Sequence, residues 1–184
     1  MDANKPKLFL HACCAPCITY PYIELFPYYT VSVYFYNPNI HPAAEYDMRL
    51  KNMRELAYKW KFDLIVASYD VNRWFQAIEG LEDCQEGGER CVECYRLRLQ
   101  KTAEAAKKRG FDLFATTLTV SPLKDAEVIN SIGQKIQKRI GINYLESDFK
   151  KKDGFKKSCE ISRQQDLYRQ NYCGCIYSKR ERKD

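Results

Sequence analysis

The sequence predicts an α/β fold, a mostly parallel sheet with helices on both faces, followed by a basic C-terminal segment. Short segments rich in β-branched and aromatic residues alternate with amphipathic segments along the chain. The amphipathic segments are long enough to carry the chain back over a sheet, as parallel strands require. At 184 residues the chain has the length of one domain. We therefore expect a single Rossmann-like domain over residues 1–184, in which residues 147–184 form the basic segment.

Five segments are predicted to be strands. Each is short and mainly apolar, as expected of strands that are covered on both faces. The predicted strands are residues 7–11, 30–37, 62–69, 111–118 and 142–146. In a parallel sheet their carboxyl ends lie at one edge, and open α/β sheets bind their ligands outside that edge.

Two helices are predicted from local signals. Over residues 42–60 apolar side chains recur at steps of three and four residues, which indicates an amphipathic helix. These side chains are Tyr46, Leu50, Met53, Ala57 and Trp60. A second helix is predicted from Cys91 to Arg109, because Gly110 supplies the residue that commonly ends a helix.

A third helix is predicted over residues 121–141, with Ser121 as its cap and Pro122 in its first turn. Its inward side chains are predicted to be Ile129, Ile132, Ile136 and Ile140. Shorter helical stretches are expected over residues 19–26, with Pro21 near the start, 74–78 and 155–168.

Composition and charge exclude some classes of protein. The N-terminus has no basic stretch followed by a long apolar one, and no run of about 18 apolar residues occurs, so we expect a cytoplasmic protein without membrane contact. A net charge of +6 favours an anionic partner. Basic residues are concentrated in residues 148–157 and 177–184, and the alternative for either run is an ordinary solvated surface.

Cysteine is the most unusual residue type, because nine cysteines in a reducing compartment point to metal binding or redox chemistry. The first predicted strand is followed by Cys13, Cys14 and Cys17. The helix that precedes the fourth predicted strand begins with Cys91 and Cys94. Helix starts are expected to lower thiol pKa values. Four of these thiolates could complete a zinc site or an iron–sulfur cluster. The position at the ligand-binding edge favours iron–sulfur.

Several alternatives accompany this prediction. The spacing of Cys14 and Cys17 also fits a thioredoxin-like dithiol, and a zinc-binding module that binds RNA is a further possibility. Cys84 and Cys159 fit isolated, buried small side chains. His11 is a candidate proton donor or metal neighbour, with a packed histidine at the strand end as the alternative. No phosphate-binding loop follows the first strand, which argues against nucleotide hydrolysis.

Cys173 and Cys175 form a different kind of pair, because a single glycine separates them. A bond between their sulfur atoms would close a small, strained ring, and strain makes a disulfide easier to reduce. Gly174 permits the unusual backbone angles that such a ring needs. The pair is therefore better suited to passing electrons than to stabilising a fold.

Four segments together resemble a known family. They are HACCAPC, CVECYRLRL, TTLTVSP and DLYRQNYCGCIYS. In this order, over nearly the whole chain, they resemble the cobalamin-independent epoxyqueuosine reductases of the QueH family. The resemblance implies an oxidoreductase that converts the epoxide of epoxyqueuosine, in the anticodon loop of a tRNA, to the alkene of queuosine in the last step of queuosine biosynthesis.

The resemblance also implies site residues. A [4Fe–4S] cluster would be held by Cys13, Cys14, Cys91 and Cys94. Cys17 would bind an additional iron or replace one of the adjacent cysteines, whose side chains face one centre only if the chain turns there. Cys173 and Cys175 would cycle between dithiol and disulfide. A separate electron donor would be needed, and candidate tRNA contacts are the basic segments with Tyr95, Arg96, Arg98 and Tyr168.

Overall fold

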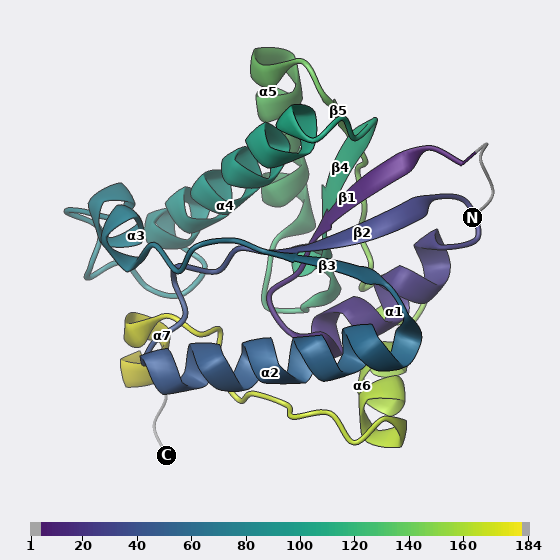
Figure 1. Cartoon of the computed structure of the whole chain (residues 1–184). Coiled ribbons are helices and arrows are strands. Elements are labelled where there is room, and N and C mark those ends of the chain that lie inside the picture. The colour runs from purple at the N-terminus through teal and green to yellow at the C-terminus, as the bar shows by residue number, and fades with distance from the viewer. Residues whose placement is uncertain (1–4, 182–184) are drawn as a thin grey trace.

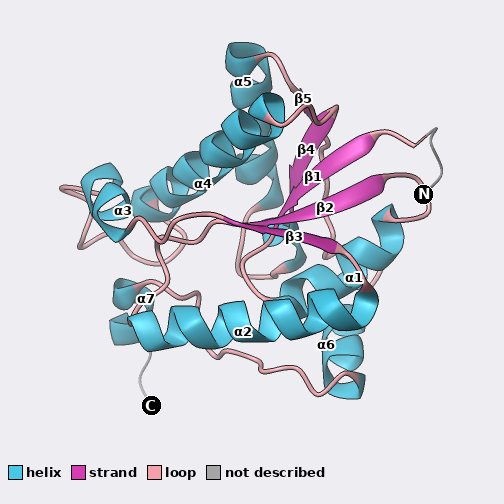
Figure 2. Cartoon of the chain, viewed as in Figure 1, coloured by secondary structure: helices cyan, strands magenta, loops and turns pink. Residues whose placement is uncertain are grey.

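A computed structural model describes residues 5–181, so the last residues of the predicted basic run 177–184 lie outside the described part. The sheet has five parallel strands in the order β3-β2-β1-β4-β5 (Figures 1 and 2). The strands are β1 (Lys7–His11), β2 (Thr30–Phe35), β3 (Asp63–Val66), β4 (Leu113–Thr116) and β5 (Asn143–Tyr144). This arrangement confirms the predicted α/β fold and all five predicted strands, most of them shorter than expected.

The helices cover both faces of the sheet. They are α1 (Ala15–Leu25), α2 (Ala43–Trp60), α3 (Val71–Ala77), α4 (Glu89–Lys108), α5 (Ala126–Ile140), α6 (Gly154–Gln164) and α7 (Ile176–Glu181), with a 3-10 helix η1 (Thr117–Val120). Figure 1 shows α4 and α5 on one side of the sheet and α1 and α2 on the other. Side chains alternate accordingly, since Leu8 and Leu10 pack with α1 and α2, whereas Phe9 packs with α4 and α5.

Strand β1 lies at the point where the strand order reverses. His11, its last residue, is in register with Tyr34 of β2 on one side and Thr116 of β4 on the other. From this point the chain first builds outward through β2 and β3, and later through β4 and β5 on the other side. In open α/β sheets the crevice at this reversal is where ligands bind.

The helix starts that differ most from the prediction are those of α1 and α5. The first helix begins at Ala15, because Pro16 occupies its first turn, and Pro21 therefore lies inside the helix. The helix predicted from Ser121 begins at Ala126, because Asp125 accepts hydrogen bonds from the Glu127 and Val128 N–H groups and caps it. Residues 121–124 form a turn that precedes the helix.

The C-terminal segment folds back over the domain. Helix α6 packs against α1, and a Cβ atom on Gly154 would clash with the Phe149 carbonyl and the Tyr20 ring. Residues 165–175 then follow α2 toward α7, a helix that the sequence did not predict (Figure 1). Within residues 5–181 no helix has the length and apolar character needed to cross a membrane.

Candidate active site

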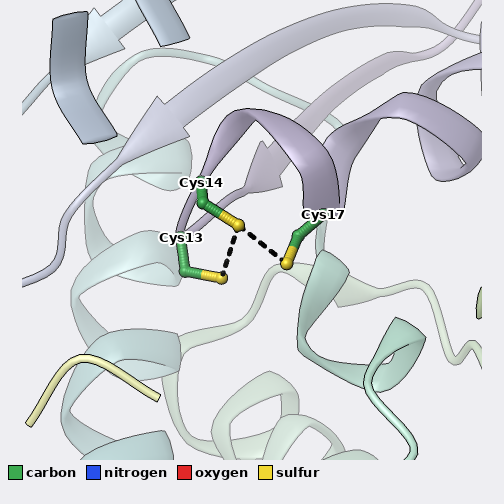
Figure 3. A group of neighbouring side chains, drawn as sticks. All are labelled: Cys13, Cys14 and Cys17. Carbon is green, nitrogen blue, oxygen red and sulfur yellow. Dashed lines mark hydrogen bonds between the residues drawn. The ribbon is translucent and has the colours of Figure 1, made fainter. Parts of the chain in front are cut away.

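Three cysteine thiols meet directly after β1. Cys14 caps α1 with an extended backbone, and Cys17 lies in the first turn of that helix. The Cys14 and Cys17 Sγ atoms are 2.8 Å apart, and those of Cys13 and Cys14 are 3.8 Å apart (Figure 3). All three sulfur atoms lie within 4.8 Å of one another, which is close enough to hold a metal ion. The chain therefore turns at Cys13, and the adjacent cysteines face the same centre.

The environment separates the three thiols by their acidity. Hydrogen bonds with Cys14 and Cys17 hold the pKa of Cys13 well below its ordinary value. Burial raises the pKa of Cys14 to about 12, and the hydrogen bonds with Cys13 and Cys14 raise that of Cys17. The three thiols share hydrogen bonds, so the loss of a proton from one of them is linked to the other two.

Cys91 and Cys94 occupy the first two turns of α4. Cys91 belongs to the same buried cluster as Cys13 and Cys14, while Cys94 packs near Cys175. Burial raises the pKa of both α4 thiols, although the Gly87 N–H donates to the Cys91 sulfur at 3.3 Å. The expectation that the helix start would lower these pKa values is therefore wrong, because burial outweighs the groups that favour the thiolate, the Gly87 N–H beside Cys91 and Arg98 beside Cys94.

A buried cation faces these thiols. Arg98 of α4 is 1% exposed, and its guanidinium donates to Asn37 Oδ1 at 2.7 Å and lies 4.0 Å from Cys94 Sγ. No carboxylate among residues 5–181 forms an ion pair with it. Burial opposes its charge, but Cys94 and Cys13 outweigh burial and raise the pKa of Arg98. A buried positive charge beside soft sulfur atoms fits a site that would hold an anionic metal–thiolate centre.

A pocket of about 180 Å³ opens beside this cysteine group. Cys13 and Cys17 form one part of its wall, and Cys173 of the C-terminal segment forms another. Lys124, from the turn before α5, also lines it; burial opposes its charge, but Cys173 and Cys13 raise the pKa of Lys124. The pocket therefore combines thiols from two ends of the chain with a positive charge.

The Cys173–Cys175 loop is held by Arg49 of α2. This arginine is 1% exposed and donates to the carbonyl oxygens of Cys173 at 3.0 Å and Tyr172 at 3.2 Å. Its Nε also donates to Glu45 at 2.6 Å. Gly174 has φ of 121°, which confirms that a residue without a side chain is needed there. Both cysteines are free thiols, as are the other seven in the chain.

Other predicted site residues occupy different environments. His11 is fully buried, its Nδ1 lies 2.9 Å from Thr116 Oγ1 and its Nε2 3.2 Å from the Tyr36 carbonyl. Burial, with Arg98 next, lowers the pKa of His11 to about 3, so the ring is neutral. These contacts are those of a packed strand-end histidine, and its role as a proton donor stays a prediction.

Two of the residues predicted to contact RNA are unavailable for it. Tyr95 and Arg98 are buried, so only Arg96 and Tyr168 remain exposed in that set. The sequence did not single out Arg49, Lys124 or Gln170 as site residues. For Arg49 a signal existed, because it lies between Tyr46 and Met53 on the apolar side of a helix, where an arginine needs a buried partner.

The fold and site together define an α/β protein with a thiol-based, metal-competent site at its topological switch point. The family model described as epoxyqueuosine reductase QueH matches residues 8–181. The chain therefore belongs to this family, and it is an oxidoreductase. Proteins named epoxyqueuosine reductase QueH from Streptococcus pyogenes serotype M1 and Thermotoga maritima are 40% and 33% identical to it, over 96% of this chain and 72% and 92% of theirs.

A solved structure supports the fold from a greater distance. The predicted subunit of a tRNA methyltransferase from Methanocaldococcus jannaschii matches with a TM-score of 0.55 at 14% identity, over 85% of this chain and 74% of that one. At this identity the likeness concerns the fold alone. Family membership, by contrast, decides in favour of the reductase over the thioredoxin-like and zinc-module alternatives.

Proposed function

We propose that the chain reduces epoxyqueuosine to queuosine within the anticodon loop of a tRNA, as the last step of queuosine biosynthesis. The observation that carries the proposal is the pocket into which Cys13 and Cys17 face from one side and Cys173 from the other. Membership of the family supports the reaction. The reaction breaks both carbon–oxygen bonds of the epoxide, forms an alkene and releases water, and it consumes two electrons and two protons.

The cysteines at the switch point are proposed to hold the cofactors. Cys13, Cys14, Cys91 and Cys94 would bind a [4Fe–4S] cluster, and Cys17 is left for a further iron. Cys13, Cys14 and Cys91 share one buried cluster, against which Cys17 also packs, and Arg98 lies beside Cys94. The close group of three sulfur atoms contains Cys17 but neither Cys91 nor Cys94, so the cluster ligands of α4 rest on the family resemblance. When bound, the cluster supplies single electrons and the further iron supplies Lewis acidity.

Cys173 and Cys175 are proposed to be the redox-active pair. Oxidation of two thiols to one disulfide releases two electrons and two protons, which balances the conversion of the epoxide to alkene and water. Cys173 lines the pocket, while the Cys175 sulfur is buried and accepts a hydrogen bond from the Ser178 N–H at 3.2 Å. A separate electron donor would then return the disulfide to the dithiol.

The first test combines metal analysis with turnover. Protein purified and reconstituted without oxygen is expected to contain about four sulfides per chain and about five irons, one more than the cluster needs. Added to tRNA that carries epoxyqueuosine, it should convert that nucleoside to one with one oxygen atom fewer, detected by mass spectrometry. Zinc in place of iron, or an iron-loaded protein that leaves the nucleoside unchanged, would contradict the proposal.

A basic surface is proposed to bind the tRNA backbone. Lys151 and Lys152 precede α6, Lys156 and Lys157 lie in its first turn, and all four are exposed. Phe155, which lines the pocket, lies among them. These positive charges therefore belong to the same segment as one residue of the pocket lining, and we propose that they bind phosphates on either side of a nucleotide inserted there.

Removing three of these charges should weaken tRNA binding and its salt dependence. The variant in which Lys151, Lys152 and Lys156 become glutamine loses about three phosphate contacts. The slope of log affinity against log salt concentration should become less steep by about 2.7. Over a fourfold rise in salt concentration, the affinity of the variant should therefore fall by roughly 40-fold less than that of the wild type. Fluorescence anisotropy with labelled tRNA at several salt concentrations measures both quantities.

The matched control removes three exposed lysines elsewhere. Lys108 at the end of α4 and Lys135 and Lys138 in α5 lie toward the opposite edge of the sheet. Their replacement by glutamine changes the net charge equally, so only a small change in slope is expected. Equal changes in slope for the two variants would show that binding depends on net charge and would reject this surface.

A further inference from the structure

Two buried polar atoms of the pocket wall lack a partner. Ser158 of α6 is 3% exposed, and its Oγ makes no hydrogen bond. Gln170 donates from Nε2 to the Cys14 sulfur at 2.9 Å, but its Oε1 is buried and unpaired. Both residues line the pocket. Burying a hydroxyl or an amide oxygen without a partner is costly, so this wall is suited to a ligand that supplies hydrogen bonds.

The rim of the same pocket is apolar and exposed. Phe155 lies one turn before Ser158 on α6, so both side chains reach the pocket from one face of the helix. Phe155 is 40% exposed and Leu123, from the turn before α5, is 65% exposed. Neither belongs to the packed clusters of the core. Exposed aromatic rings surrounded by positive charge commonly stack on unpaired bases.

We infer that this pocket is a substrate subsite in which Ser158 and Gln170 hydrogen-bond the hydroxyl groups of a ring placed against the thiols, while Phe155 stacks on an unpaired base at the rim. The inference rests on the proposed function, because it assigns the hydroxyl-bearing ring of epoxyqueuosine to the pocket. Gln170 is then a positioning residue with two contacts, one to a proposed cluster ligand and one to the substrate.

The two residues have different expected effects. Ser158 contacts only the ring that distinguishes epoxyqueuosine from guanine, whereas Phe155 contacts a base that is present in either tRNA. Ser158→Ala should therefore reduce the preference for epoxyqueuosine-containing tRNA over the same tRNA with guanine by about fivefold. Phe155→Leu should weaken binding of both tRNAs by about 10-fold and leave their ratio unchanged.

The measurement is a pair of equilibrium titrations for each variant, one with each tRNA. Ser162→Ala is the control for Ser158, because Ser162 is buried one turn later on α6, does not line the pocket and donates within the helix to the Ser158 carbonyl at 2.5 Å. Tyr58→Leu is the control for Phe155, since Tyr58 is 89% exposed on α2. Both controls should retain the wild-type affinities and ratio.

The outcomes separate the subsite from the function. If the wild-type enzyme reduces epoxyqueuosine but Ser158→Ala keeps its full preference, the subsite is wrong and the function stands. If Phe155→Leu binds both tRNAs as tightly as Tyr58→Leu does, the stacking role is wrong. If the iron-loaded wild-type enzyme neither prefers nor reduces epoxyqueuosine-containing tRNA, the proposed function itself fails.

Discussion

Replacing Cys13 with alanine is expected to remove the four-iron cluster and lower turnover by at least about 100-fold. Losing a partner that only orients a metal ligand already costs about 10- to 100-fold, and losing a ligand costs more. The Cys13 sulfur also lies within 4.8 Å of two other thiols, so its removal leaves only two of the three grouped sulfur atoms. Iron and sulfide per chain, with turnover of epoxyqueuosine-containing tRNA, measure the effect.

Replacing Cys17 with alanine distinguishes the two proposed metal roles. If Cys17 holds the further iron, this variant keeps about four sulfides per chain but loses one iron and its turnover. Loss of sulfide instead would make Cys17 a cluster ligand. Cys159→Ala is the control, because Cys159 lies on α6 outside the cysteine group and outside the pocket. Full iron and sulfide in Cys13→Ala would contradict the ligand set.

Replacing Arg49 with methionine is expected to lower the free energy of unfolding by about 3–5 kcal/mol, because it leaves Glu45 without its buried cation. It also removes the donors to the Tyr172 and Cys173 carbonyls. Release of this loop should make Cys173 and Cys175 react faster with a thiol reagent and reduce turnover. Chemical denaturation and mass spectrometry of the labelled thiols report the two effects separately.

Two variants test the cause of that loss. Arg54 is exposed on the same helix, so Arg54→Met should change stability by no more than about 0.5 kcal/mol. Arg49→Lys keeps the charge beside Glu45 but lacks the planar guanidinium that donates to two carbonyl groups. Compared with Arg49→Met, it should therefore regain part of the stability and a smaller part of the protection of the Cys173 and Cys175 thiols. Thiol reactivity in Arg49→Met equal to that in wild type would show that the arginine does not hold the loop.

Local signals in the sequence were sufficient for most elements of the fold. The first strand was predicted at its observed bounds, since its apolar run begins and ends within a few residues. Gly110 follows the end of α4 with φ of 72°, as its position predicted. The start of α5 was missed, because Ser121 offers a cap as plausible as that of Asp125, and only the fold determines which residue takes the role.

The sequence by itself determined the alternation of strands and helices and the grouping of cysteines, because periodicity, capping and spacing act over a few residues. Only the tertiary structure decided which distant groups meet. Arg49 reaches the Cys173 carbonyl across 124 positions, and Gln170 reaches the Cys14 sulfur across 156. Such contacts follow from strand order and helix packing, which bring the C-terminal segment to the switch point. The local pattern at Arg49 signals only that a buried partner is needed, and neither sequence neighbourhood identifies the partner, because a polar side chain acquires a distant partner only when the chain is folded.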